Sequence, residues 1–166
     1  ENGLLERAEK NGIDSEQIVL PENITQEDLL AEIDKLNQDP GVDGVLIFRP
    51  LPKQIDEEAV CRALDPKKDV DGITPGSMAG VFMGSEKGFP PCTAAACIQM
   101  LDYYGIDLNG KNVTVFGRSL VVGKPVAMMA MDRNATVTIC HSRTTPEMLR
   151  DAGRKADVVI AAVGRA

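Results

Sequence analysis

Residues 113–125 read Val113-Thr-Val-Phe-Gly117-Arg-Ser-Leu-Val-Val-Gly123-Lys-Pro125, and this segment is the clearest indication of the fold. The β-forming residues Val113 to Phe116 run into a turn bounded by two glycines, and a helical pattern follows. Proline suits the first helical position because it has no N–H donor to leave unpaired. The stretch therefore predicts a strand over 113–116, a glycine-rich turn, and a helix over 125–133.

The same alternation continues downstream, with a strand expected over 136–140, a helix over 146–155 and a strand over 158–163. Strands that alternate with helices form parallel sheets, and a βαβαβ unit is half of a doubly wound nucleotide-binding fold. We therefore expect a lobe of Rossmann type over 107–166. The chain ends at Ala166, directly after the third strand, so we expect this lobe to be incomplete.

Upstream, residues 1–106 predict a second α/β lobe, which makes the expected fold two-lobed. Helices are expected over 1–10, 29–36 with a cap at Thr25, 56–64 and 93–104, and strands over 17–20 and 42–48. Residues 65–80 are expected to form a long loop that carries Asp-Gly and Pro-Gly turns. The first helix begins with the chain, which suggests that a longer protein precedes it.

Composition argues against several classes of function. A net charge of −7 without a long Lys/Arg run disfavours a nucleic acid or an anionic membrane surface as partner. No apolar run approaches the roughly 20 residues that span a bilayer, and no signal peptide is recognised. The four cysteines lack a paired CxxC spacing, so neither a zinc site nor a disulfide framework is indicated. Reduced thiols indicate a cytoplasmic protein.

The turn from Gly117 to Pro125 has the features of an anion site, because helix N-termini bind anions. Gly117 allows a tight turn, Gly123 a close approach of backbone to a pyrophosphate, and Ser119 supplies a hydroxyl donor. The spacing is not the dinucleotide fingerprint GxGxxG. From these residues alone, a nucleotide-binding turn and an ordinary strand-to-helix turn both remain open.

The end of the second strand reads His141-Ser142-Arg143, about 20 residues beyond the glycines, where a dinucleotide fold places the adenosine ribose. An acidic residue there would accept from the 2′-hydroxyl of NAD, whereas Ser and Arg donors suit the 2′-phosphate of NADP. The residues favour NADP. The alternative is that Arg143 is a solvated charge and His141 a capping residue.

The segment Lys67-Lys-Asp-Val-Asp-Gly72 is expected to be extended, with two carboxylates on one side next to a glycine that can turn sharply. A calcium-binding EF-hand is excluded, because its first and twelfth loop positions would be Lys67 and Met78. A structural Asp-Gly turn and a ligand-binding carboxylate both remain open. The amino-pyrimidine edge of a pterin, with adjacent N–H donors, is one suitable ligand.

Hydride transfer suits a sequence without the common hydrolytic parts, because a cofactor carries that chemistry. The sequence has no serine hydrolase elbow, HExxH motif, Walker loop or second histidine.

Taken together, the motifs resemble the methylenetetrahydrofolate dehydrogenase/methenyltetrahydrofolate cyclohydrolase family over nearly the whole chain. The matching segments are Arg49-Pro-Leu-Pro52, Lys68-Asp-Val-Asp-Gly72, Pro91-Cys-Thr93, Gly117-Arg-Ser119 with Val122-Gly-Lys-Pro125, and Ala135-Thr-Val-Thr138 leading into Cys140-His-Ser142. They occur in the family's order. The resemblance implies a chain truncated at both ends relative to that family.

By this resemblance, Asp71 holds the folate and takes part in catalysis, with Phe48, Pro50, Leu51 and Pro52 in the same site. Hydride would pass from 5,10-methylenetetrahydrofolate to NADP, and a homodimer is expected. The implied NADP site comprises Gly117, Arg118, Ser119, Gly123, Pro125, His141, Ser142, Arg143, Val163 and Gly164.

The departures from the family concern its second activity. Ungapped alignment puts Leu4 at the family's catalytic lysine and Phe48 at its glutamine. Apolar side chains neither donate nor shuttle protons, so we expect cyclohydrolase activity to be very weak or absent. Ala94 and Ala96 also replace the usual proline and glycine after Pro91-Cys-Thr93. Three hypotheses follow from the resemblance and its departures: a folate dehydrogenase, a regulatory module that binds NADP and folate without turnover, and an unrelated Rossmann-type binding protein.

Overall fold

The computed structural model describes residues 2–85 and 87–164. Glu1, where the first predicted helix begins, and Arg165 and Ala166, at the end of the predicted second lobe, lie outside the described residues. The elements follow in the order α1 (Asn2–Lys10), α2 (Gln26–Gln38), α3 (Glu57–Ala63), α4 (Pro75–Met83), α5 (Cys92–Tyr103), β1 (Asn112–Phe116), α6 (Gly123–Asp132), β2 (Thr136–Cys140), α7 (Pro146–Lys155) and β3 (Val158–Ala161).

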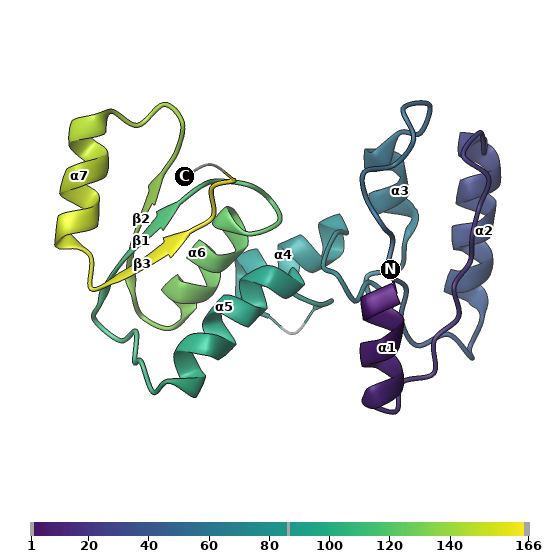
Figure 1. Cartoon of the computed structure of the whole chain (residues 1–166), viewed down its shortest axis with the longest axis horizontal. Helices are drawn as coiled ribbons and strands as arrows, with labels where there is room; N and C mark the ends of the chain where they lie inside the picture. Colours follow the sequence, from purple (N-terminus) through teal and green to yellow (C-terminus); the bar gives the residue numbers. More distant parts are fainter. Residues whose placement is uncertain (1, 86, 165–166) are drawn as a thin grey trace.

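The three strands form one parallel sheet in the order β2-β1-β3 (Figure 1). The central strand is β1, where Val115 is in register with Ile139 of β2 on one side and Ile160 of β3 on the other. The prediction of an α/β fold with a parallel sheet is thus confirmed. Because β3 returns to the far side of β1, the topology changes direction there, and open α/β sheets bind ligands beyond the carboxyl ends of strands at such a point.

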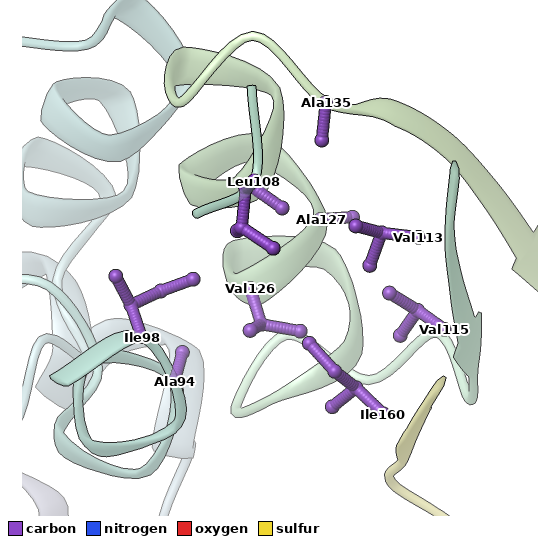
Figure 2. Packing of buried hydrophobic residues seen from close by; sticks show 10 residues of the cluster. Ala94, Ile98, Leu108, Val113, Val115, Val126, Ala127, Ala135 and Ile160 are labelled. Carbon is purple, nitrogen blue, oxygen red and sulfur yellow. The ribbon is translucent and has the colours of Figure 1, made fainter. Parts of the chain in front are cut away.

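Helices cover both faces of the sheet, with α6 on one side and α7 on the other (Figure 1). Val113 and Val115 belong to a buried cluster shared with α5, α6 and β3 (Figure 2). The alternate residue Thr114, only 3% exposed, faces α7, where its hydroxyl donates to the Ala152 carbonyl at 3.0 Å. The two-residue period of the strand therefore explains the two helical layers.

Helix α5 packs against α6 and contributes Ala94 and Ile98 to the same buried cluster. A two-pronged ion pair also joins these helices, with Arg133 Nη1 and Nη2 lying 2.8 and 2.9 Å from the carboxylate oxygens of Asp102. The predicted helix over 93–104 is confirmed. The lobe boundary between residues 106 and 107 stays a prediction.

Helices α1, α2 and α3 gather at the opposite end of the molecule from the sheet, with α4 between (Figure 1). The predicted cap is confirmed, because the Thr25 hydroxyl accepts from the Asp28 N–H at 3.1 Å. Asp56 caps α3 in the same way, accepting from the Glu58 N–H at 2.9 Å. The buried residues of this end are Leu29, Ile33, Ile55, Val60 and Leu64.

The two strands predicted in the first lobe are wrong. Residues 17–20 have no regular structure, and in residues 42–48 only Val45 forms an isolated parallel bridge, to Asp69. A strand needs a continuous ladder, but Val45 donates to the Lys68 carbonyl at 2.7 Å and the neighbouring chain then turns away. Val45 and Ile47 instead pack on the helical cluster, which explains their β-like apolar pattern.

The loop predicted over 65–80 is wrong in its second half, because α4 begins at Pro75. The Thr74 hydroxyl accepts from the Ser77 N–H at 3.1 Å, and Pro75 occupies the first turn. A capping threonine followed by proline is a helix start rather than a turn. Within residues 2–85 and 87–164, none of the helices is long and apolar enough to cross a membrane.

The loop before α4 depends on Gly72, which has a left-handed φ of +67°. A Cβ at this position would lie 2.6 Å from the Pro90 carbonyl carbon and 2.7 Å from the Phe89 carbonyl oxygen. Both neighbours are backbone atoms, which cannot move aside as a flexible side chain can. Gly72 is therefore required both for its backbone conformation and for the close approach of residues 89–91.

We expect Gly72→Ala to lower the free energy of unfolding more than Gly105→Ala does. Gly105 has nearly the same φ, +66°, but nothing lies within 4 Å of an added Cβ, so its substitution measures the left-handed strain alone, about 1–2 kcal/mol. The backbone clash at residue 72 should add a further 1–3 kcal/mol, roughly. Urea unfolding of the two variants measures the difference, and equal losses would contradict this account of Gly72.

Candidate functional site

The predicted site residues lie in two places, the loop that carries Asp71 and the carboxyl edge of the sheet. In the first place the structure distinguishes the two acids of the Lys68-Asp-Val-Asp-Gly72 segment. Asp69 is completely buried, whereas the Asp71 side chain is 32% exposed. The expectation that both carboxylates lie on one side of an extended segment is wrong, because the segment turns at residues 70–71.

Asp69 is fully engaged within the protein. Its Oδ1 accepts from the Ile73 N–H at 3.0 Å, and its Oδ2 accepts from the Thr74 N–H and the Ser77 hydroxyl, each at 2.7 Å. Burial opposes ionisation, but these hydrogen bonds outweigh it and hold the pKa of Asp69 below its ordinary value. Asp69 is therefore a buried carboxylate with a structural role, and Asp71 is the acid available to a ligand.

Arg49 lies beside Asp71, a contact that the sequence did not reveal. Its Nη2 is 3.8 Å from Asp71 Oδ2, and its Nη1 donates to Glu57 Oε1 at 3.2 Å. Arg49 thus contacts two acids from different segments, Asp71 in the 69–72 loop and Glu57 in α3. No local spacing in the sequence signals this arrangement, since residues 49 and 71 meet only through the fold.

Cys92, at the start of α5, is the second neighbour that sequence reasoning missed. Its Sγ donates to the Val70 carbonyl at 3.1 Å. Burial, and after it the charge of the Asp71 carboxylate, raises the pKa of the Cys92 thiol. The thiol is therefore protonated near neutral pH and suited to donating a hydrogen bond, not to acting as a nucleophile.

The remaining predicted folate residues flank this loop from the 48–52 segment. Phe48 is 48% exposed and Pro50 is exposed, whereas Leu51 packs on the buried helical cluster and Pro52 is half-buried. Leu4, aligned with the family lysine, is 41% exposed on α1. The apolar side chains at the two departures are thus both accessible.

At the carboxyl edge of the sheet, the backbone brings the three strand ends together. The Gly117 N–H donates to the Cys140 carbonyl at 2.8 Å, and the Ala162 N–H donates to the Phe116 carbonyl at 2.7 Å. Gly117 has a φ of +123°, and a Cβ there would lie 2.5 Å from the Ala162 carbonyl oxygen. Gly117 is thus needed where β1 passes the end of β3.

Gly123 permits a close approach of a different kind from the one predicted. It is buried, and a Cβ there would meet the Gly117 carbonyl oxygen and lie 2.8 Å from the Arg118 nitrogen. Both are atoms of the turn itself. In this structure Gly123 lets the first residue of α6 pack against the turn after β1.

Ser119 organises the N-terminus of α6. Its hydroxyl accepts from the N–H groups of Val122 and Gly123, at 3.1 and 3.4 Å, and its carbonyl accepts from the Lys124 N–H at 3.0 Å. The helix begins at Gly123, so Pro125 is its third residue. The prediction that Pro125 is the first helical residue is therefore wrong. Among the described residues, the Ser119 hydroxyl is seen only as an acceptor.

The segment after β2 forms a tight turn closed by Thr144. The His141 N–H donates to Thr144 Oγ1 at 2.9 Å, and the Arg143 N–H donates to His141 Nδ1 at 3.2 Å. His141 is half-buried, whereas Ser142 and Arg143 are exposed. His141 thus accepts a backbone hydrogen bond within the turn, whereas the N-cap of α7 is Thr145.

The other predicted cofactor residues share this edge. Arg118 is exposed on the turn after β1, and Val163 and Gly164 are exposed directly after β3. The edge therefore presents arginine and hydroxyl donors, which suits an anionic ligand.

Among the described residues, no group of three or more His, Cys, Asp or Glu side chains is arranged to hold a metal ion.

A small cavity of about 190 Å³ lies between α4 and α6. None of the predicted site residues lines it. The described residues around it are Ser77, Gly80, Val81, Gly84, Ser85, Lys87, Gly88, Pro90, Met129 and Asp132.

Comparison with known proteins identifies two domains of one family in this chain. The family model described as "Tetrahydrofolate dehydrogenase/cyclohydrolase, catalytic domain" matches residues 2–71. The model described as "Tetrahydrofolate dehydrogenase/cyclohydrolase, NAD(P)-binding domain" matches residues 91–166. Their order along the chain is the order of the two predicted lobes.

Individual relatives agree with the family models. The bifunctional protein FolD of Clostridioides difficile is 48% identical over 166 residues, which are 100% of this chain and 57% of that protein. The bifunctional methylenetetrahydrofolate dehydrogenase/cyclohydrolase FolD of Campylobacter jejuni has a TM-score of 0.94 and 39% identity, covering 98% of this chain and 57% of that one. The Trypanosoma brucei enzyme, complexed with NADP cofactor and inhibitor, has a TM-score of 0.88 and 33% identity, covering 96% and 54%.

The chain thus spans about 57% of the length of the Clostridioides difficile relative. Both family models, the relatives and the motif resemblance agree on the same assignment. The chain belongs to the tetrahydrofolate dehydrogenase/cyclohydrolase family.

Proposed function

We propose that the protein is an NADP-dependent methylenetetrahydrofolate dehydrogenase with Asp71 in its folate site. The observation that carries the proposal is the division between the two acids of the Lys68–Gly72 segment. The Asp69 carboxylate accepts hydrogen bonds from Ile73, Thr74 and Ser77. The Asp71 carboxylate, in the same loop, is accessible to a ligand.

The carboxylate of Asp71 matches the donors of a reduced pterin. The amino-pyrimidine edge presents adjacent N–H groups, and a fixed carboxylate accepts two of them side by side. The half-buried Pro52 and the exposed faces of Phe48 and Pro50 offer apolar surface next to this acid for the ring system. Leu51 anchors the 48–52 segment by packing on the buried helical cluster.

The donors at the carboxyl edge fit NADP. Arg118, Ser142 and Arg143 are exposed and carry no acidic neighbour in sequence that would repel a 2′-phosphate. Gly117, Ser119, Gly123, Pro125 and His141 shape the turns that present them, and Val163 and Gly164 follow the adjacent strand. When bound, NADP supplies the acceptor for hydride from the folate methylene group.

We also propose that the protein acts as a homodimer in the cytoplasm, without a nucleic acid or membrane partner. The family resemblance supports the dimer. The net charge of −7 supports the absence of a nucleic acid or membrane partner, and cysteines without paired CxxC spacing support the cytoplasm. Light scattering of the purified complete protein tests the dimer directly.

We expect Asp71→Ala to lower kcat/KM for 5,10-methylenetetrahydrofolate. Loss of a charge-assisted hydrogen bond costs about 1.5–3 kcal/mol, which is roughly 10-fold to 150-fold, and Asp71→Asn should be milder. A spectrophotometric assay with NADP measures the effect on the complete protein. Asp43→Ala removes an exposed acid outside the loop and is the matched control. Wild-type kcat/KM in Asp71→Ala would refute the assignment.

We expect Arg118→Ala and Arg143→Ala to weaken NADP binding by about 10-fold to 100-fold while NAD binding stays nearly unchanged. Only the 2′-phosphate loses its charged partner in these variants. Ratios of kcat/KM for the two cofactors measure the change, with Arg150→Ala on α7 as the control. Parallel losses for NAD and NADP, or equal use of both by the wild type, would mean that these arginines are solvated charges.

We expect cyclohydrolase activity to be very weak or absent, because Leu4 and Phe48 supply neither an acid nor a base. The decay of methenyltetrahydrofolate, followed with and without enzyme, measures it. Hydrolysis clearly above the spontaneous rate would contradict the expectation. A protein that binds NADP and folate but transfers no hydride would instead be the regulatory module.

A further inference from the structure

We propose that Asp69 is a positioning residue of the folate site, which fixes the loop so that Asp71 presents its carboxylate to the pterin. The inference rests on the proposed function, in which Asp71 binds the substrate. Asp69 itself is completely buried and reaches no ligand, so it acts only through the backbone that it holds.

The hydrogen bonds of Asp69 close the loop on both sides of Asp71. The carboxylate accepts from the N–H groups of Ile73 and Thr74, which lie four and five residues further along the chain. Asp71 is therefore enclosed within a ring that the charge of Asp69 closes. A ring of this size leaves the backbone of residues 70–72 little freedom to reorient.

The same carboxylate ties the loop to α4. Ser77 donates its hydroxyl to Asp69 Oδ2 at 2.7 Å, and that hydroxyl also accepts from Thr74 Oγ1 at 3.0 Å. The Phe89 N–H approaches the Ser77 oxygen at 3.4 Å. The negative charge of Asp69 thus lies at the N-terminus of a nine-residue helix, where it is favourable.

Contacts on the other flanks complete the restraint. Lys68 donates its ammonium to the carbonyls of Leu36 and Asp39, at 2.7 and 2.6 Å, and so joins the loop to the end of α2. On the far side, the Cys92 thiol donates to the Val70 carbonyl at 3.1 Å. The loop is therefore bound to α2, α4 and α5, and the contacts that Asp69 Oδ2 makes with Thr74 and Ser77 are buried.

The position requires a carboxylate rather than an amide of the same shape. All three partners of Asp69 are donors, two backbone N–H groups and one hydroxyl. Asparagine has one accepting oxygen, and its NH2 group would face at least one of these donors. Asp69→Asn therefore keeps the volume, removes the charge and leaves a buried donor without an acceptor.

The deciding experiment is a double-mutant cycle of Asp69→Asn with Asp71→Ala on the complete protein. We expect Asp69→Asn alone to raise KM for methylenetetrahydrofolate about 10-fold and to change KM for NADP less than about 2-fold. In the Asp71→Ala background, Asp69→Asn should add less than about 3-fold, because the residue through which it acts is gone.

Asp56→Asn is the matched control. Asp56 is also an aspartate that accepts from backbone N–H groups at the start of a helix, but its helix is α3. The Asp56→Asn change should alter thermal stability little, because asparagine caps a helix about as well as aspartate, and it should leave both KM values unchanged. Ser77→Ala removes one hydrogen bond to Asp69 and should raise KM for folate about 3-fold, and it replaces Asp69→Asn in the cycle if that variant does not fold.

The two proposals fail in distinguishable ways. If Asp71→Ala changes kcat/KM but the effects of the two substitutions multiply, Asp69 is only structural and the inference is overturned. The same conclusion holds if Asp69→Asn lowers kcat while both KM values stay at their wild-type levels. If Asp71→Ala itself has no effect, the proposed folate site is wrong and the inference falls with it.

Discussion

The two-sided pairing of β1 is the interaction on which the nucleotide-binding end of the molecule depends. Parallel ladders to β2 and β3 bring three strand ends to a single edge, and the alternation of Val113, Thr114 and Val115 places one helical layer on each face. The turn after β1 and the segments after β2 and β3 lie next to each other for that reason alone. Residues separated by about 45 positions in sequence, Arg118 and Val163, thereby share one surface.

The sequence predicted this end well because its signals are local. The apolar runs of the three strands, the glycines of the turn and the proline near the start of α6 each act within a few residues. The first lobe was harder, because residues 42–48 have the composition of a strand but no continuous partner. Whether an extended apolar segment becomes a strand depends on what lies beside it, which no local pattern contains. The start of α4 is a different case, because its signal was local. Thr74 followed by Pro75 is a helix-capping pattern, although these residues lie in a segment predicted to be a loop.

The residue types of the candidate folate site were predictable, and the family resemblance assigned Asp71 to the folate, but the structural role of Asp69 was not predictable from the local sequence. Lys68-Asp-Val-Asp-Gly72 offered two equivalent acids, and only the fold buries Asp69 against Thr74 and Ser77. Arg49 and Cys92 approach Asp71 from segments about 20 residues away on either side. Burial and long-range contact decide such roles, and both are properties of the assembled chain.

The capping of α6 by Ser119 has a consequence for how the edge of the sheet receives a ligand. The N–H groups of Val122, Gly123 and Lys124 are bonded within the turn, so the turn is ordered before anything arrives. Binding to a preorganised loop loses little conformational entropy. Affinity at this edge is then set by the exposed side chains and not by folding of the loop. In the proposed function, the exposed arginine and hydroxyl groups are the ones that discriminate between related cofactors.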